Sequence, residues 1–324
     1  MRGWNGWAIC AVLLACLGGA CLLSLFLGAA NVPLADMLHS GIIRLRVARI
    51  LLAITAGAGL SVSGVVFQAL LRNPLAEPYV LGVSSGAGLG AAAAIVLGLA
   101  ATSAWMLPGM AFGGALVTIL LVYALARQAN GAVPMHTMLL SGVIVSAILG
   151  SALMFLVSAS SSENLHSVMW WLLGNLQIFD WGLLRVAASV VGLGVLFTMI
   201  FARDLNVMTL GDESAAHLGL DVEHARKLFL LVASLMTGAT VASCGLIGFV
   251  GLIVPHSVRL AIGPDHRRLV PASAISGAAF LVLADAFART AMAPVEIPIG
   301  VVTAFLGGPF FLFLLRRRKR SYWG

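Results

Sequence analysis

The arrangement of this chain is decided by the stretch Arg72-Asn73-Pro74-Leu75-Ala76-Glu77-Pro78-Tyr79-Val80-Leu81-Gly82-Val83-Ser84-Ser85-Gly86-Ala87-Gly88-Leu89-Gly90, which ends the uncharged run 50–71. Its two prolines lack amide donors and restrict the residues before them, so the chain turns here instead of continuing as a helix. A helix is expected after the turn. Glycines four residues apart share one helical face and let a neighbouring backbone approach closely, as in tightly packed membrane helices. These glycines are Gly82, Gly86 and Gly90.

Composition places the chain in a membrane. Hydrophobic residues make up 60% of its 324 residues and charged residues 10%, with a mean hydropathy of +1.04. Soluble domains carry roughly 25% charged residues, and one crossing needs about 20 apolar residues. We therefore predict an all-α polytopic membrane protein with about ten transmembrane helices, some short or broken. The predicted spans are 7–30, 50–71, 79–99, 105–126, 136–158, 183–202, 228–243, 245–261, 269–288 and 297–315.

The run 228–258 needs special treatment because it is long for one crossing and short for two. Both of its flanks are basic, and this indicates that both face the cytoplasm and that the number of crossings is even. Two short helices satisfy this requirement, and so does a re-entrant pair broken at 243–245. Broken helices are tolerated in a membrane against protein or a water-filled cavity.

The basic residues indicate the orientation. With a cytoplasmic start, fourteen of the nineteen lysines and arginines fall in cytoplasmic segments, which places both termini in the cytoplasm. The net charge of +7 therefore reflects membrane topology and not binding to nucleic acid. The five basic residues of the outer side are Arg44, Arg46, Arg49, Arg185 and Arg289.

The loop 204–221 carries four of the twelve acidic residues and is expected to contain a short helix. Ala215, Ala216 and Leu218 can share one surface of this helix, with two acids near its N-terminus and a glycine at each end. Apolar residues in such a loop favour a protein partner below the membrane. The alternative is a solvated connector. The residues assigned to this coupling segment are Leu210, Gly211, Asp212, Glu213, Ala215, Ala216, Leu218 and Gly219.

Three arginines on the predicted outer side are unusual, because basic residues of membrane proteins gather on the cytoplasmic side. Arg46 and Arg49 are three residues apart and share a face if they are helical, and Arg289 lies on the same side of the membrane. One hypothesis is a ring of positive charge that orients an acidic protein over a pore. The alternative is that Arg289 forms an ion pair with Asp285 and that the other two meet lipid head groups.

The residues favour transport over catalysis. Neither lysine, Lys227 or Lys319, follows the glycine-rich pattern that cradles nucleotide phosphates, so any ATP is hydrolysed by another subunit. The four cysteines sit singly in apolar runs, and we expect no metal site and no cofactor. Ionisable residues at membrane depth, which mark proton or ion relays, are nearly absent. A secondary transporter or channel is the second hypothesis, and an intramembrane hydrolase is the third.

The chain resembles the FecCD family, the permease subunits of binding-protein-dependent ABC importers for iron-siderophores, haem and cobalamin. The resemblance covers nearly the whole chain, with Ala48 as a departure where the family often has proline. Its motifs are the segments 45–49, 72–90, 210–220, 245–259, 284–285, 298–300 and 306–309.

The resemblance implies a type II ABC importer permease fold, with residues 1–324 as one transmembrane domain and a cytoplasmic coupling loop at about 204–226. It implies a homodimer, two ATP-binding cassette ATPase subunits, and a periplasmic or surface-tethered binding protein that meets Arg46, Arg49 and Arg289. The implied location is a bacterial or archaeal plasma membrane, and the implied cargo is a ferric siderophore or haem, with cobalamin as the alternative. The implied cytoplasmic gate comprises His136, Thr137, Met138 and Ser141.

Overall fold

The computed structural model describes residues 6–28, 41–128, 133–177 and 180–322, and within these ranges it contains α-helices, 3₁₀ turns and connecting segments. The α-helices are α1 (Gly6–Phe26), α3 (Ile42–Leu70), α4 (Val83–Val96), α5 (Met106–Ala126), α6 (Met135–Ser158), α7 (Ser162–Leu172), α8 (Trp181–Ile200), α9 (Ala202–Met208), α10 (Asp212–His217), α11 (Val222–Cys244), α12 (Val250–Ile262), α13 (His266–Thr290) and α14 (Ile299–Tyr322). The 3₁₀ turns are η1 (Pro78–Leu81) and η2 (Leu99–Ala101).

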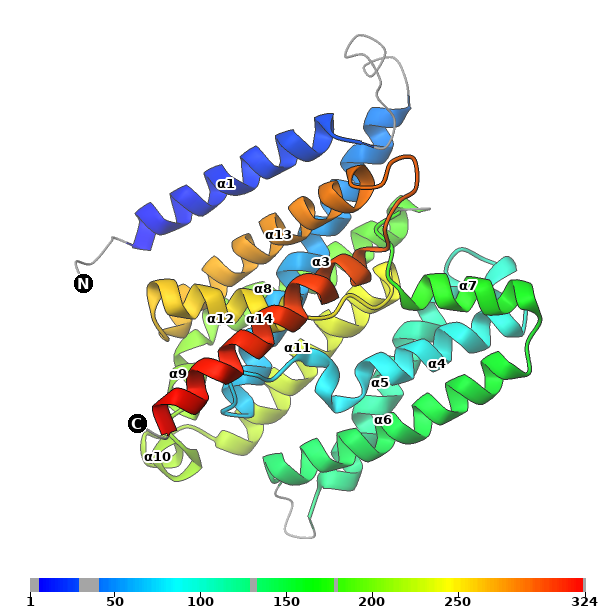
Figure 1. Cartoon of the computed structure of the whole chain (residues 1–324). Helices are drawn as coiled ribbons and strands as arrows, with labels where there is room; N and C mark the ends of the chain where they lie inside the picture. The colour runs from blue at the N-terminus through cyan, green and yellow to red at the C-terminus, as the bar shows by residue number, and fades with distance from the viewer. Residues whose placement is uncertain (1–5, 29–40, 129–132, 178–179, 323–324) are drawn as a thin grey trace.

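The predicted all-helical membrane fold is confirmed. Seven helices of the described residues are long and apolar enough to cross a membrane, and α4, α12 and the first part of α14 are shorter apolar helices. Each of the ten predicted spans overlaps one of these helices. The start of α1 and the end of α14 lie toward the same side of the bundle as α10 (Figure 1), as an even number of crossings requires.

Helix α3 is the centre of the bundle. It is 29 residues long, it packs against α8, α11, α12 and α13, and most of its side chains are buried. Glycines allow two of these contacts. A Cβ atom on Gly64 would lie 1.9 Å from the carbonyl oxygen of Gly251, and one on Gly57 would lie 2.2 Å from that of Gly277. At both positions a neighbouring backbone takes the place of a side chain.

The predicted glycine face is present in part. Gly82 ends η1 with a φ of +83° and precedes α4, so it does not share the helical face. Gly86 and Gly90 do lie on that face and pack against α5. A Cβ atom on Gly86 would lie 2.4 Å from the carbonyl oxygen of Gly114, and one on Gly90 would lie 2.2 Å from that of Met110.

The predicted break in the run 228–258 occurs at Gly245, which has a φ of +70° and follows the end of α11. One of the two expected short helices is not short. Helix α11 begins at Val222, inside the predicted cytoplasmic loop, and therefore reaches 23 residues. Helix α12 has only 13 residues and begins after Phe249, a non-glycine residue with a φ of +67°.

Side chains from the 72–90 stretch hold this break. The Glu77 carboxylate accepts a hydrogen bond from the Phe249 amide at the start of α12. The Tyr79 hydroxyl donates to the carbonyl oxygen of Ile247 and accepts from its amide, both at 3.1 Å. Unwound backbone inside a membrane protein requires such internal partners because no water is there to replace them. Nothing in the sequence around Glu77 indicates this role.

We expect Gly86→Leu to destabilise the protein by about 1–3 kcal/mol or more, because the new side chain meets the α5 backbone. Thermal unfolding in detergent measures this loss. Gly113→Leu is the matched control, since a Cβ atom at Gly113 has no neighbour within 4 Å. A substitution at the neighbouring residue Leu81 is not used as the control. Leu81 is buried, so its replacement by alanine would itself create a cavity and lower the stability. Equal melting temperatures for the two leucine variants would contradict the packing argument.

Candidate functional site

The predicted coupling segment forms a compact corner of three helices at one end of the bundle. Helix α9 follows α8 directly, and α10 precedes α11. The two predicted glycines bracket α10, with φ angles of +113° at Gly211 and +86° at Gly219. Both angles lie in the region that favours glycine, so these residues allow the sharp entry to and exit from a six-residue helix.

Ion pairs fasten α10 to the bundle. One oxygen of Asp212 accepts from Arg226 Nη2 at 2.7 Å, and the other contacts Arg72 at the end of α3. Arg226 is buried and also pairs with Glu223 at 2.8 Å. Asp212 therefore links α10 to both α3 and α11. From the sequence, Asp212 is one of two acids expected near a helix N-terminus, and its pairs with Arg72 and Arg226 appear only once the helices are placed against each other.

The exposed surface of this corner differs from the predicted one at one residue. Leu210 and Leu218 are 63% and 64% exposed, and Ala216 is also exposed. Ala215 is fully buried and faces the bundle, so it does not belong to the predicted surface. Two leucines thus project from a segment that is itself anchored.

A second link joins α9 to the start of α13. The Asn206 amide nitrogen donates to Asp265 at 2.8 Å, and its oxygen accepts from the His266 backbone amide at 2.9 Å. The hydrogen bond from Asn206 is the main reason that the pKa of Asp265 lies below its usual value. The coupling corner is thereby tied to α13 as well.

The opposite end of the bundle holds a network of charged side chains. Arg49 on α3 pairs through Nε with Asp285 at 2.9 Å and through Nη1 with Glu296 at 2.9 Å. Arg289 pairs with the other oxygen of Asp285 at 3.0 Å. Asp285 is 1% exposed and Glu296 is 32% exposed. One buried carboxylate therefore bridges two guanidinium groups, and a second carboxylate covers one of them from outside.

Two arginines also bind the C-terminal end of α1. Arg289 donates to the carbonyl oxygens of Leu27 and Ser24 at 2.8 and 3.2 Å, and to the Ser24 hydroxyl at 2.8 Å. Arg46 donates to the carbonyl oxygen of Leu25 at 2.8 Å. The last carbonyls of a helix have no internal partners and carry partial negative charge, so guanidinium groups suit this position.

The three arginines therefore do not form the exposed ring that the sequence suggested. They lie mostly within the protein, and the alternative pairing of Arg289 with Asp285 is present. The expected contact of Arg46 and Arg49 with lipid head groups is replaced by the α1 carbonyls and by Asp285. Docking of a partner on these residues stays a prediction.

A family model and known proteins match this chain along most of its length. The model of the FecCD transport family matches residues 13–317. The chain belongs to this family. The cobalamin import system permease BtuC of Halobacterium salinarum is 48% identical over 275 residues, which are 85% of this chain and 73% of the relative. The hemin transport system permease HmuU of Yersinia pestis is 39% identical over 86% of this chain and 84% of the relative.

The fold agrees with a solved structure. A metal-chelate type ABC transporter in an inward-facing conformation has a TM-score of 0.87 and 30% identity, covering 96% of this chain and 99% of the other. The protein is thus a multi-pass membrane subunit of the ABC importer permease type.

The four residues predicted for a gate of this permease lie on the first two turns of α6. His136 is exposed, Thr137 and Ser141 are half-buried, and Met138 is buried in the core of the bundle. Met138 therefore faces inward, whereas His136 faces the outside of the single chain. A gating role for these residues stays a prediction.

We expect Asp285→Ala to destabilise the permease by about 3–5 kcal/mol, because it leaves the buried guanidinium of Arg289 and the mostly buried one of Arg49 without their shared carboxylate. Glu296→Ala is the matched control. It removes a partly exposed partner of Arg49 and should cost only about 0–1 kcal/mol. Thermal unfolding of both variants in the same detergent measures the difference, and similar losses for the two would show that burial of the network does not govern its strength.

Proposed function

We propose that this permease forms, as a homodimer, the pathway for uptake of a metal chelate, driven by ATP hydrolysis on two separate ATP-binding cassette subunits. The observation that carries the proposal is the pair of exposed leucines on the coupling segment. Leu210 and Leu218 expose apolar side chains at one end of the bundle, where a protein surface can cover them. The segment 204–226 is the proposed docking site for the ATPase, on the cytoplasmic side.

The anchoring of this segment supports a coupling role. A movement imposed on α10 reaches α3 and α11 through the Asp212 pairs with Arg72 and Arg226. The contacts of Asn206 extend the connection to α13. Helix α3 packs along much of its length against α11 and α13, so the corner acts on the centre of the bundle.

The proposed cargo is an iron chelate or haem. The hemin permease of Yersinia pestis and the metal-chelate type transporter support it. Cobalamin is the second candidate, and the 48% identity with the permease of Halobacterium salinarum favours it. These cargoes have different visible absorption spectra, so the spectrum of the ligand that the cognate binding protein retains on purification separates them.

A homodimer is supported by the outward face of α6. Apolar residues along this helix are exposed in the single chain, among them Leu140, Ile148 and Phe155. A second copy can cover this face, and the predicted gate residues begin the same helix. We propose that residues 1–324 form one transmembrane domain in a bacterial or archaeal plasma membrane with both termini in the cytoplasm.

The opposite end is the proposed site for a substrate-binding protein. Arg46 and Arg289 are occupied by the end of α1, whereas the outer partner of Arg49 is the partly exposed Glu296. An acidic side chain of a binding protein can replace Glu296 on Arg49 without breaking the buried pair with Asp285. Arg49 is therefore the proposed point of contact among the three.

A secondary transporter or channel is the candidate of a different class. Transport by this class does not require a separate ATPase, so uptake by vesicles that contain the permease alone would favour it.

We expect Leu218→Glu to uncouple ATP hydrolysis from uptake, because a charge on the exposed face opposes the burial of that face against the ATPase. Uptake and ATP hydrolysis in reconstituted vesicles measure the effect, which should exceed tenfold on uptake. The matched control is Leu218→Met, which keeps an apolar side chain of similar volume at the same position. Normal uptake by an assembled Leu218→Glu complex would reject the docking surface.

We expect Arg49→Ala to slow the association of the cognate binding protein by up to about fivefold at low salt, with a smaller effect at high salt. Glu296→Ala should have the opposite sign, because it frees the outer side of Arg49. Both association rates can be measured by passing the binding protein over surface-immobilised permease. Arg203→Ala, at the other end of the bundle, is the control. Unchanged association rates for both outer variants at low salt would remove Arg49 from the contact.

A further inference from the structure

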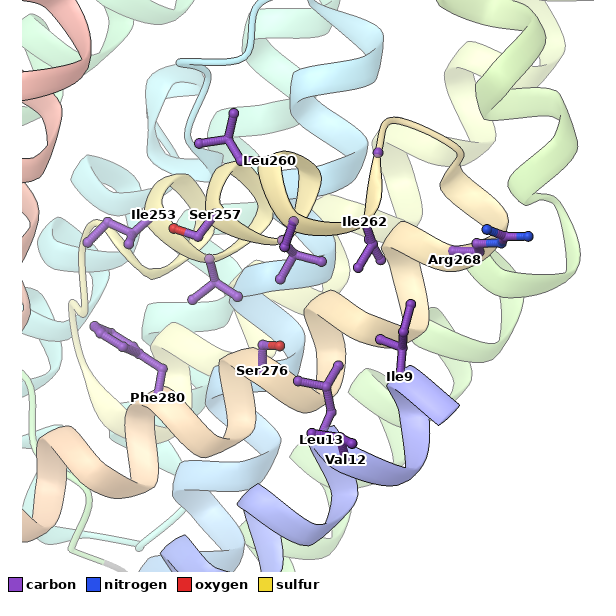
Figure 2. A pocket seen from close by; sticks show the side chains of 14 residues that line it. Ile9, Val12, Leu13, Ile253, Ser257, Leu260, Ile262, Arg268, Ser276 and Phe280 are labelled. Atoms are coloured by element: carbon purple, nitrogen blue, oxygen red, sulfur yellow. The ribbon is translucent and has the colours of Figure 1, made fainter. Parts of the chain in front are cut away.

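An apolar groove runs between the first half of α1 and the α12–α13 corner. It has a volume of about 820 Å³, within the range of about 300–1,000 Å³ that is usual for ligand pockets. Figure 2 shows Ile9, Val12 and Leu13 of α1 on one side and Leu260 of α12 on the other. Phe280 of α13 lies at one end.

The groove follows from the way α1 is attached. The second half of this helix is packed, with Ala20 and Ser24 buried, and its last carbonyls are bound by Arg46 and Arg289. Residues 8–19 include no buried side chain. Val12 is 51% exposed and Leu260 is 72% exposed, so the two walls of the groove face outward without covering each other.

Positive charge gathers at one end of the groove. Arg268 lines it at the first turn of α13 and is exposed (Figure 2). Arg267 stands beside it, and Arg259 occupies the last turn of α12. Asp265 is the acidic residue of this corner, and its side chain is engaged with Asn206. The local balance is therefore positive.

We propose that this groove binds one anionic phospholipid, with an acyl chain between α1 and α12 and the phosphate on Arg268. Two observations select this occupant. The lining is mostly hydrocarbon, with the hydroxyl groups of Ser257 and Ser276 among it, and a gap of this size in a membrane protein must be filled to keep its packing contacts. The charge is confined to one end, and this matches a lipid whose head group is negative. Basic pockets between membrane helices bind anionic head groups on the cytoplasmic side, which is the side proposed here for α10 and the start of α13.

The site does not depend on the cargo or on the ATPase. A lipid in this position contacts α12, whose first amide is held by Glu77, and α13, whose start is tied to the coupling segment by Asn206. It would thus fill the space between the loosely packed first helix and the two helices beside it.

Native mass spectrometry of the full-length permease, titrated with phosphatidylglycerol or phosphatidylcholine after delipidation, tests the proposal. We expect one phosphatidylglycerol to bind each chain more tightly than phosphatidylcholine. Arg268→Gln should lower the phosphatidylglycerol affinity roughly fivefold and leave phosphatidylcholine unchanged, as the loss of one basic residue at a membrane surface predicts. Arg127→Gln, an exposed arginine at the end of α5 that does not line the groove, should leave both unchanged.

A groove-filling variant supplies the second arm. Ser257→Phe should reduce the retention of both lipids. If this variant is thermally unstable, Ala261→Leu, which adds a smaller side chain to the groove, tests the same point and should also reduce retention. Equal affinity for the two lipids, or equal loss in the Arg127 and Arg268 variants, would overturn the head-group assignment. If Ser257→Phe removed the dimer and left lipid binding intact, the groove would be a contact between copies of the chain.

Discussion

The structure depends on the satisfaction of an unwound stretch of backbone, Gly245–Phe249, within a bundle of membrane helices. The backbone groups of such a stretch have no water with which to form hydrogen bonds, so each polar group needs a partner from the protein. Glu77 and Tyr79 supply three of these hydrogen bonds, and just before the stretch the Asn175 amide donates to the carbonyl oxygen of Cys244, the last residue of α11, at 2.8 Å. The break shortens α12 and brings its start against α3, where Gly64 and Gly251 allow contact of the two backbones.

Charged residues serve the two ends of the permease in similar ways. At one end Asp212 joins α10 to α3 and α11, and at the other Asp285 joins α3 to α13. Helix α3 takes part in both networks through residues near its two ends, so it connects the proposed ATPase surface to the proposed binding-protein surface. At one end the buried Arg226 holds the helices together and Leu218 is exposed to a partner. At the other end the buried Asp285 holds the helices and the partly exposed Glu296 can meet a partner.

The places of the apolar helices along the chain and the break near Gly245 could be predicted because they depend on local hydropathy, proline and glycine. The packing of Gly86 followed from a four-residue spacing. The remaining features depend on contacts between distant segments. Nothing local to Glu77 indicates that it binds the Phe249 amide, and Ala215 looks as suited to an exposed surface as Ala216 until α10 is placed on the bundle. The three outer arginines were identified as unusual, but Arg46 and Arg289 bind main-chain carbonyls, which any sequence can provide, and Arg49 binds two carboxylates that lie far away in the sequence.

The attachment of α1 has a consequence for the synthesis of this permease. Helix α1 is the first of these helices to be made, but Arg289, which binds the Leu27 carbonyl, follows 262 residues later. Arg46 arrives within the next helix and can bind the Leu25 carbonyl at once. The first helix is thus held by a single guanidinium while the intervening helices are inserted. Its final position against α13 is set only near the end of translation, so until then α1 is kept in the bilayer by its hydrophobicity and by Arg46.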